Sequence, residues 1–233
     1  MYKCVCTSIE GFIQQLAVSL IPHGYVFYVM GCVPEGKNPE RVDAKLIERY
    51  SVDVSKWTRA RQKRRGIASV QYLRYRELFV LIATHGEHQF FLDEAVSIRD
   101  LRRVPLKAFG YSLSSKRGHA HVRIERQEFK ALKSYFARRA VHRRTESLEL
   151  DLRSLPYEPY APVRRQLLEL LRGINRTRRA AGFVAVPVEA LRFKRRIVRP
   201  FGDEVPLSNL VGGRRGELER GGGASSSPAH QRG

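Results

Sequence analysis

Two hydrophobic periodicities alternate along the first half of the chain. Apolar residues recur every four positions between Phe12 and Leu20, which predicts a helix that begins after a Ser8 cap. The next segment, 25–33, is apolar at successive positions, as is typical of a central strand that is covered on both faces. The pattern therefore predicts helices packed against buried strands.

Cap and turn residues divide the rest of this half into further elements. Asn38 followed by Pro39 opens a second helix, and Ser55 can cap a short third one. Turn residues separate the apolar runs that follow into two hairpins. The elements expected here are a strand over 1–6, helices over 39–50 and 55–66, and hairpins over 67–84 and 106–125, with 85–105 irregular.

From residue 126 onward the spacing of apolar residues is helical. Helices are expected over about 126–140, 147–155, 162–181 and 187–194, with a stiff proline-rich connector at 156–162. The fold class expected for the whole chain is α+β. It comprises a mainly antiparallel sheet with packed helices (1–125), a basic helical extension (126–201) and a disordered Gly/Ser-rich C-terminal tail (202–233).

The chain carries a large surplus of positive charge. Its 233 residues include 43 Lys+Arg against 23 Asp+Glu, and segments 1–125 and 126–201 carry +8 and +12 of the net +20. Such a surplus repels itself unless anions are near, so it indicates a polyanionic partner. Arginine outnumbers lysine 33 to 10, and its planar guanidinium suits phosphate. A GC-rich genome would explain that ratio but not the net charge. We therefore expect nucleic acid as the partner, with DNA slightly favoured over RNA.

The first of three basic segments covers 54–76 and contains no acidic residue. A solvated helix face normally intersperses acids with its bases, so their absence favours phosphate contacts. Trp57 and Tyr72 lie in this segment and can either stack on bases or pack in the core; we favour the core for Trp57. The candidate nucleic-acid contacts are Arg59, Arg61, Lys63, Arg64, Arg65, Tyr72, Arg74 and Arg76.

The second basic segment is the helix expected over 162–181, which has two opposite faces. Its apolar residues cluster within about 100° of the helix circumference and predict a buried stripe. On the opposite side four arginines form a row about 21 Å long, which can follow a phosphate backbone or lie in a groove. The stripe contains Val163, Leu167, Leu170, Leu171 and Ile174, and the row contains Arg165, Arg172, Arg176 and Arg179.

The third basic segment, 192–199, includes Arg195 and Arg196, and no acidic residue lies between Glu189 and Asp203. Short basic runs are common, so this segment counts mainly together with the other two. A further surface follows from strand alternation, because His119, His121 and Arg123 share one face of the expected 119–125 strand. If that face coincides with the one bearing Tyr72, Arg74 and Arg76, the sheet presents an open platform for unpaired bases.

The triplet His119-Ala120-His121 resembles the His-hydrophobic-His signature of HUH endonucleases, which nick single-stranded DNA during replication and transposition. The resemblance implies a mobile-element or replication protein. Its two histidines would hold Mg²⁺ or Mn²⁺, with His85, Glu87 or His88 as the third ligand, and Tyr135 would be the nucleophile. The helical stripe beside Tyr135 indicates, in contrast, that this tyrosine and the two histidines lie on different sides of the sheet.

Other classes of function find less support in the sequence. Walker-type and Rossmann-type phosphate loops are absent, and no cysteine and histidine spacing matches a zinc finger, so no cofactor is expected unless the nicking alternative holds. No apolar run is long enough for a membrane span, which favours a cytoplasmic or nucleoid-associated protein. A basic module that docks on acidic proteins or anionic membranes remains a third alternative.

Overall fold

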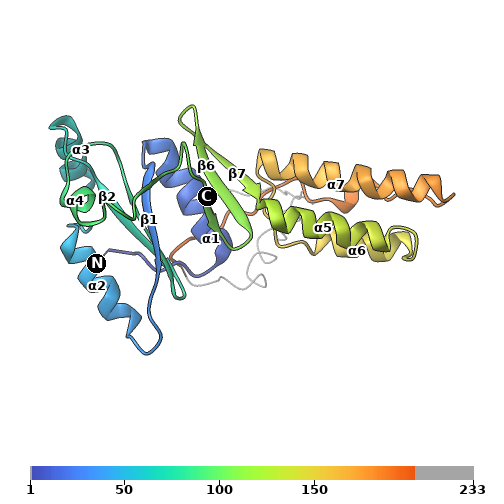
Figure 1. Ribbon diagram of the computed structural model, residues 1–233, viewed down its shortest axis with the longest axis horizontal. Coiled ribbons are helices and arrows are strands. Elements are labelled where there is room, and N and C mark those ends of the chain that lie inside the picture. The colour runs from blue at the N-terminus through green and yellow to red at the C-terminus, as the bar shows by residue number, and fades with distance from the viewer. Residues whose placement is uncertain (1, 203–233) are drawn as a thin grey trace, which may run out of the picture. The chain divides into compact units, whose positions relative to one another are not determined.

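The computed structural model describes residues 2–202, which form one compact unit (Figure 1). Apart from Gly202, the segment expected to be a disordered tail lies outside the described residues. The strands are β1 (Phe27–Cys32), β2 (Val70–Tyr75), β3 (Leu78–Ala83), β4 (Arg99–Asp100), β5 (Leu106–Ala108), β6 (Tyr111–Lys116) and β7 (His119–Ile124). The helices are α1 (Ile9–Gln14), α2 (Pro39–Arg49), α3 (Lys56–Arg64), α4 (Gln89–Asp93), α5 (Arg126–Arg139), α6 (Thr145–Arg153) and α7 (Ala161–Ala180).

Two antiparallel sheets organise the fold, which confirms the α+β prediction. The first sheet has the strand order β2-β3-β1-β4 and the second has the order β5-β6-β7. The second sheet has one more strand than the expected hairpin, because Phe109 and Gly110 turn the chain with φ of 52° and 76°. A Cβ at Gly110 would lie 2.9 Å from the Tyr157 hydroxyl, so this turn requires glycine.

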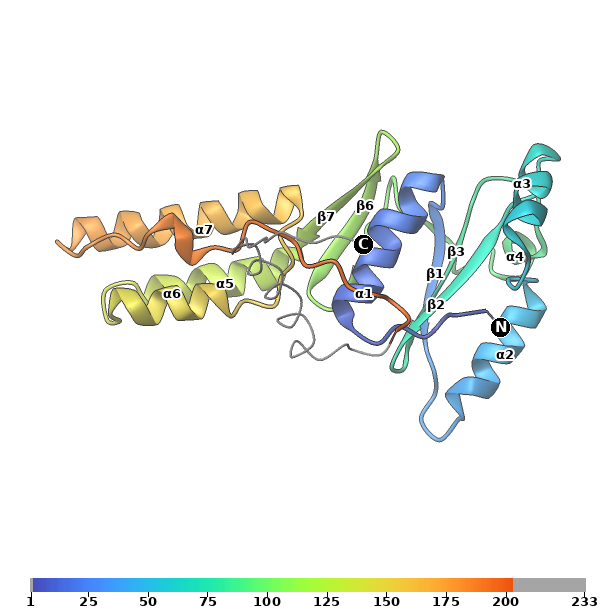
Figure 2. The ribbon, with the colours of Figure 1, turned by 180° about the vertical axis from the view of Figure 1, so that it is seen from behind.

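Helices pack on both faces of the first sheet, and the expectation of a covered strand over 25–33 holds for Tyr28 and Val29, whereas Met30 and Cys32 are exposed. Leu73 and Val80 share the larger core with α1 and with the π-helical stretch Gln15–Leu20 that continues it. On the opposite face Tyr72 and Leu81 pack with Tyr50 and Phe90, which α2 and α4 bring there. Figure 2 shows α1 between the two sheets, and the larger core indeed contains residues of both.

The predicted helix caps are confirmed. The Ser8 hydroxyl accepts from the Gly11 amide at 3.0 Å, and Asn38 and Ser55 cap α2 and α3 in the same way. The expected strand over 1–6 reduces to one bridge between Val5 and Arg74, and the expected helix over 187–194 to a 3₁₀ turn, Val188–Ala190. Segment 85–105, expected to be irregular, contains α4 and β4.

The helices of the C-terminal half, α5, α6 and α7, lie side by side (Figures 1 and 2). The apolar stripe predicted for α7 is buried from Val163 to Ile174 and joins the same core as the second sheet. Gln166 also fixes α7 to the free edge of β7, because its side chain accepts from the Ile124 amide at 2.8 Å and donates to the Ile124 carbonyl at 3.1 Å. Among the described helices, none is long and apolar enough to cross a bilayer.

Candidate nucleic-acid interface

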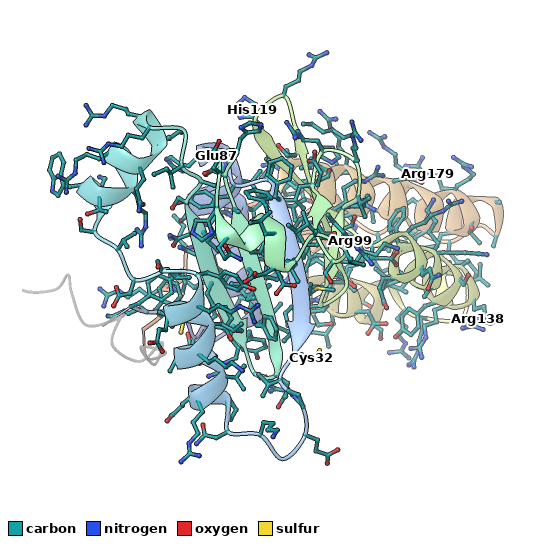
Figure 3. The ribbon with its side chains drawn as sticks, turned by 60° about the vertical axis from the view of Figure 1, so that its left-hand side comes forward. Cys32, Glu87, Arg99, His119, Arg138 and Arg179 are labelled. Carbon is teal, nitrogen blue, oxygen red and sulfur yellow. The ribbon has the colours of Figure 1, made fainter. Side chains whose placement is uncertain are left out.

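The arginine row of α7 faces solvent along its whole length. Arg165, Arg172, Arg176 and Arg179 are exposed, and none of them pairs with a carboxylate among residues 2–202. Glu169, the acidic residue of α7, bonds instead to Lys133 of α5. The four guanidinium groups therefore remain uncompensated. Figure 3 labels Arg179 near the end of the row.

The outer face of β7 continues this positive surface. His119, His121 and Arg123 point away from the core while Val122 and Ile124 are buried, as strand alternation predicts. Burial lowers the pKa of His121, and the positive charges of Lys116, Arg123 and Arg165 lower it further. Arg165 of α7 therefore lies near the outer face of β6 and β7.

We call this continuous surface the cationic face. It consists of Lys116 of β6, His121 and Arg123 of β7, and Arg165, Arg172, Arg176 and Arg179 of α7. No member of the set has a carboxylate partner in the described part of the chain. Gln166 contributes to the geometry of this surface, because it joins α7 to Ile124 at the end of β7, the edge strand that carries His121.

Tyr72 and Arg74 do not belong to the interface, and this corrects the platform expected from strand alternation. Both are buried against Asp43 of α2, whose Oδ1 accepts from the Tyr72 hydroxyl at 2.6 Å and from Arg74 Nε at 2.8 Å. The face of β2 that bears them is covered by α2, and β2 and β7 belong to different sheets. Arg76 is exposed at the β2–β3 turn, over the ring of Tyr75.

In the third basic segment, Arg192 and Arg196 pair with acids from elsewhere in the chain and Arg195 is half-buried against Tyr160, which corrects the expectation that Arg195 and Arg196 are free to contact phosphates. Glu158 is 3% exposed and accepts from Arg196 Nε at 3.1 Å and from the Arg196 amide at 2.8 Å. Arg192 lies 3.6 Å from the same carboxylate. Arg195 stacks on the ring of Tyr160 and donates to its hydroxyl at 3.3 Å. These arginines hold the C-terminal segment in place.

The sequence reasoning missed Arg178, which is buried next to the exposed row. Its guanidinium donates to the carbonyl groups of Ala140, Arg143 and Val184 and to the Thr145 hydroxyl, over 2.6–3.0 Å. It therefore locks the turn between α5 and α6 to the end of α7. The only signal in the sequence is its helical position, about 100° away from Arg179 and toward the apolar stripe.

In the first basic segment, six cations are exposed and lack a carboxylate partner among the described residues: Lys56, Arg61, Lys63, Arg64, Arg65 and Arg76. Arg59 is half-buried and donates to the Val52 carbonyl at 3.2 Å. The expectation that Trp57 packs in the core is wrong, because Trp57 is 81% exposed.

The residues that resemble the nicking-enzyme site lie in different parts of the fold. Tyr135 lies under the guanidinium of Arg139, and its hydroxyl faces Asp151 of α6 at 3.4 Å. His85 follows β3 in the first sheet, its ring 6.2 Å from that of Phe27. Within residues 2–202 no group of three or more His, Cys, Asp or Glu side chains is arranged to hold a metal ion. The resemblance remains a prediction.

The chemistry available to the cationic face is therefore the binding of phosphate groups along an extended anion. Serine hydroxyls at Ser112 and Ser114 of β6 stand opposite Arg123 and His121 and add hydrogen-bonding capacity to it. A scan against protein-family models matches none of them, and a search of the curated proteins finds no relative of this chain.

Proposed function

We propose that this protein binds nucleic acid through the cationic face. The observation that carries the proposal is the row of exposed, uncompensated guanidinium groups on α7, which continues onto the outer face of β7. Like charges held this close together repel one another, so the arrangement favours a ligand that brings negative charge to all of them.

The length of the row favours a polymer over a small anion. From Arg165 to Arg179 the helix rises by about 21 Å, several times the spacing between neighbouring phosphates of a nucleic-acid strand. One phosphate or carboxylate can neutralise one or two guanidinium groups, whereas a phosphodiester backbone can reach all four. Backbone phosphates are common to DNA and RNA, so both are ligands to test, with DNA slightly favoured.

Salt dependence of binding tests the proposal. The triple variant R172Q/R176Q/R179Q should bind a fluorescein-labelled duplex more weakly. Its plot of log affinity against log salt concentration should also be less steep by about 2–3, because each lost phosphate contact removes close to one released counterion. Fluorescence anisotropy over about 50–200 mM NaCl measures both quantities.

A matched control separates the row from net charge. Arg49, Arg102 and Arg153 are also exposed, but each is paired with a carboxylate, so R49Q/R102Q/R153Q removes the same formal charge from other surfaces. We expect this variant to keep a salt slope close to that of the native chain. Equal losses in the two triple variants would contradict the assignment to α7. A native protein that binds neither DNA nor RNA, single-stranded or double-stranded, at about 50 mM salt would overturn the proposal itself.

A further inference from the structure

Helix α3 presents a second basic surface that the cationic face does not include. Trp57 is 81% exposed on this helix and is the single tryptophan of the chain. Arg61 and Arg64 follow it at four and seven positions, which places all three side chains on one face of the helix. Lys56 and Lys63 flank that face, and both are exposed.

The fold imposes this orientation on Trp57. Ser55 caps α3, with its hydroxyl 3.1 Å from the Thr58 amide, and Arg59 donates to the Val52 carbonyl at 3.2 Å. Thr58, Arg59 and Gln62 are half-buried and lie on the side of α3 opposite Trp57. The indole is thus held in solvent by a helix that is attached through its other side.

An exposed indole followed along the same helix face by two guanidinium groups matches the chemistry of an unpaired nucleotide. The flat ring can stack on the face of a base, while the cations next to it neutralise the adjoining phosphates. In a duplex both faces of each base are covered by its neighbours, so only unpaired or terminal bases offer a free face for stacking.

The composition of α3 argues against a membrane as the ligand. A helix that lies in a bilayer interface needs a broad apolar stripe. The outer face of α3 offers Trp57 and Ala60 as its apolar residues, and its remaining positions are charged. An acidic protein could neutralise the cations, but it would provide no flat partner that specifically suits an indole.

We propose that α3 is a second nucleic-acid contact that selects single-stranded segments by stacking Trp57 on an unpaired base. This inference rests on the proposed function, which supplies nucleic acid as the class of ligand. It concerns a different surface and specifies that the nucleic acid contacted there is single-stranded. Arg61 and Arg64, which follow Trp57 along the helix, hold successive phosphates on one side of the stacked base. The remaining cations of α3 extend the contact along the strand.

Intrinsic fluorescence tests the stacking directly, because all indole emission comes from Trp57. We expect a single strand of about 12 nucleotides to quench it strongly. An oligomer of the same length with abasic sugars has the same phosphates and should bind with little quenching. A duplex closed at both ends by base-free linkers has no unpaired or open terminal base and should also quench little. Binding in each case is followed independently by the anisotropy of a label on the nucleic acid.

Substitutions distinguish stacking from charge. Trp57→Ala should weaken single-strand binding about 5- to 100-fold without changing the salt slope, whereas Trp57→Phe should recover much of the affinity. R61Q/R64Q should reduce the slope by about 1.4, since each contact to a single strand releases about 0.7 counterion. Circular dichroism verifies that each variant folds, as is expected for exposed positions.

The outcomes separate this inference from the proposed function. If single strands bind but leave the emission unchanged, or if Trp57→Ala binds them normally, stacking by Trp57 is wrong while the proposed function stands. Equal quenching by the abasic oligomer also overturns it in favour of charge alone. A blue shift with anionic vesicles and no quenching by single strands would assign α3 to membranes. If no nucleic acid binds at all, both proposals fail.

Discussion

At the scale of single residues, neighbouring arginines in this chain have opposite roles. Arg178 is 2% exposed and makes four hydrogen bonds, whereas Arg179 is exposed and lacks a carboxylate partner among the described residues. Both have the same charge and differ by one position, so composition and local charge density do not separate them. The separation comes from a helical rotation of about 100° between successive residues.

This difference predicts unequal effects on stability. Arg178→Ala should lower the free energy of unfolding by about 2–4 kcal/mol, because it leaves buried carbonyl groups without their charged donor. Arg179→Ala should change it by less than about 0.5 kcal/mol. Urea denaturation followed by circular dichroism measures both values. Equal stability of the two variants would show that Arg178 has no structural role.

At the scale of elements, α7 has both a structural face and a charged face. Its buried stripe contributes to the core beside the second sheet, and its opposite face carries the arginine row. Gln166 lies between the stripe and the row, and its side chain bonds both the amide and the carbonyl of Ile124 at the edge of β7. A strand edge with unpaired backbone groups is otherwise open to pairing with another chain.

Removing this clamp should loosen the edge. Gln166→Leu leaves two buried backbone groups without partners and should destabilise the fold by about 2–4 kcal/mol. In this variant the amide of Ile124 should also exchange its hydrogen with solvent faster than the amides of β3 do. NMR can follow this exchange. Gln127→Leu is the control, since that side chain is exposed. Unchanged exchange at Ile124 in the Gln166 variant would rule out the clamp.

At the scale of the whole molecule, net charge opposes compactness. The chain carries +20, and Lys116, Arg123 and Arg165 lie close enough to His121 for their charges to lower its pKa. Repulsion among them destabilises the compact state in the absence of anions. The proposed ligand would remove this cost on binding.

Screening should therefore stabilise the free protein. Raising NaCl from about 20 to about 200 mM should increase Tm by about 2–4 °C, since the Debye length falls below the spacing of the more distant cations. Differential scanning fluorimetry measures the shift. A Tm that falls over this range would mean that favourable ion pairs, such as those of Glu158 and Asp43, outweigh the repulsion.

Much of the fold follows from local pattern. The caps at Ser8, Asn38 and Ser55, the two-sided burial of the first half of β1 and the two faces of α7 were all predicted, because each depends on residues within a few positions of one another. The candidate site was predicted in part. The α7 row and the outer face of β7 are exposed as expected, whereas Tyr72, Arg74 and Arg196 are engaged within the protein.

The sequence by itself determined the elements, the amount of charge and the segments that carry it. Only the tertiary structure decided which of these charges are free. Asp43 reaches Arg74 across 31 positions and Glu158 reaches Arg196 across 38, and no periodicity encodes such pairs. The physical reason is that helical and strand periods specify which face a side chain is on, whereas a partner from a distant segment specifies whether that face is open to solvent or already satisfied.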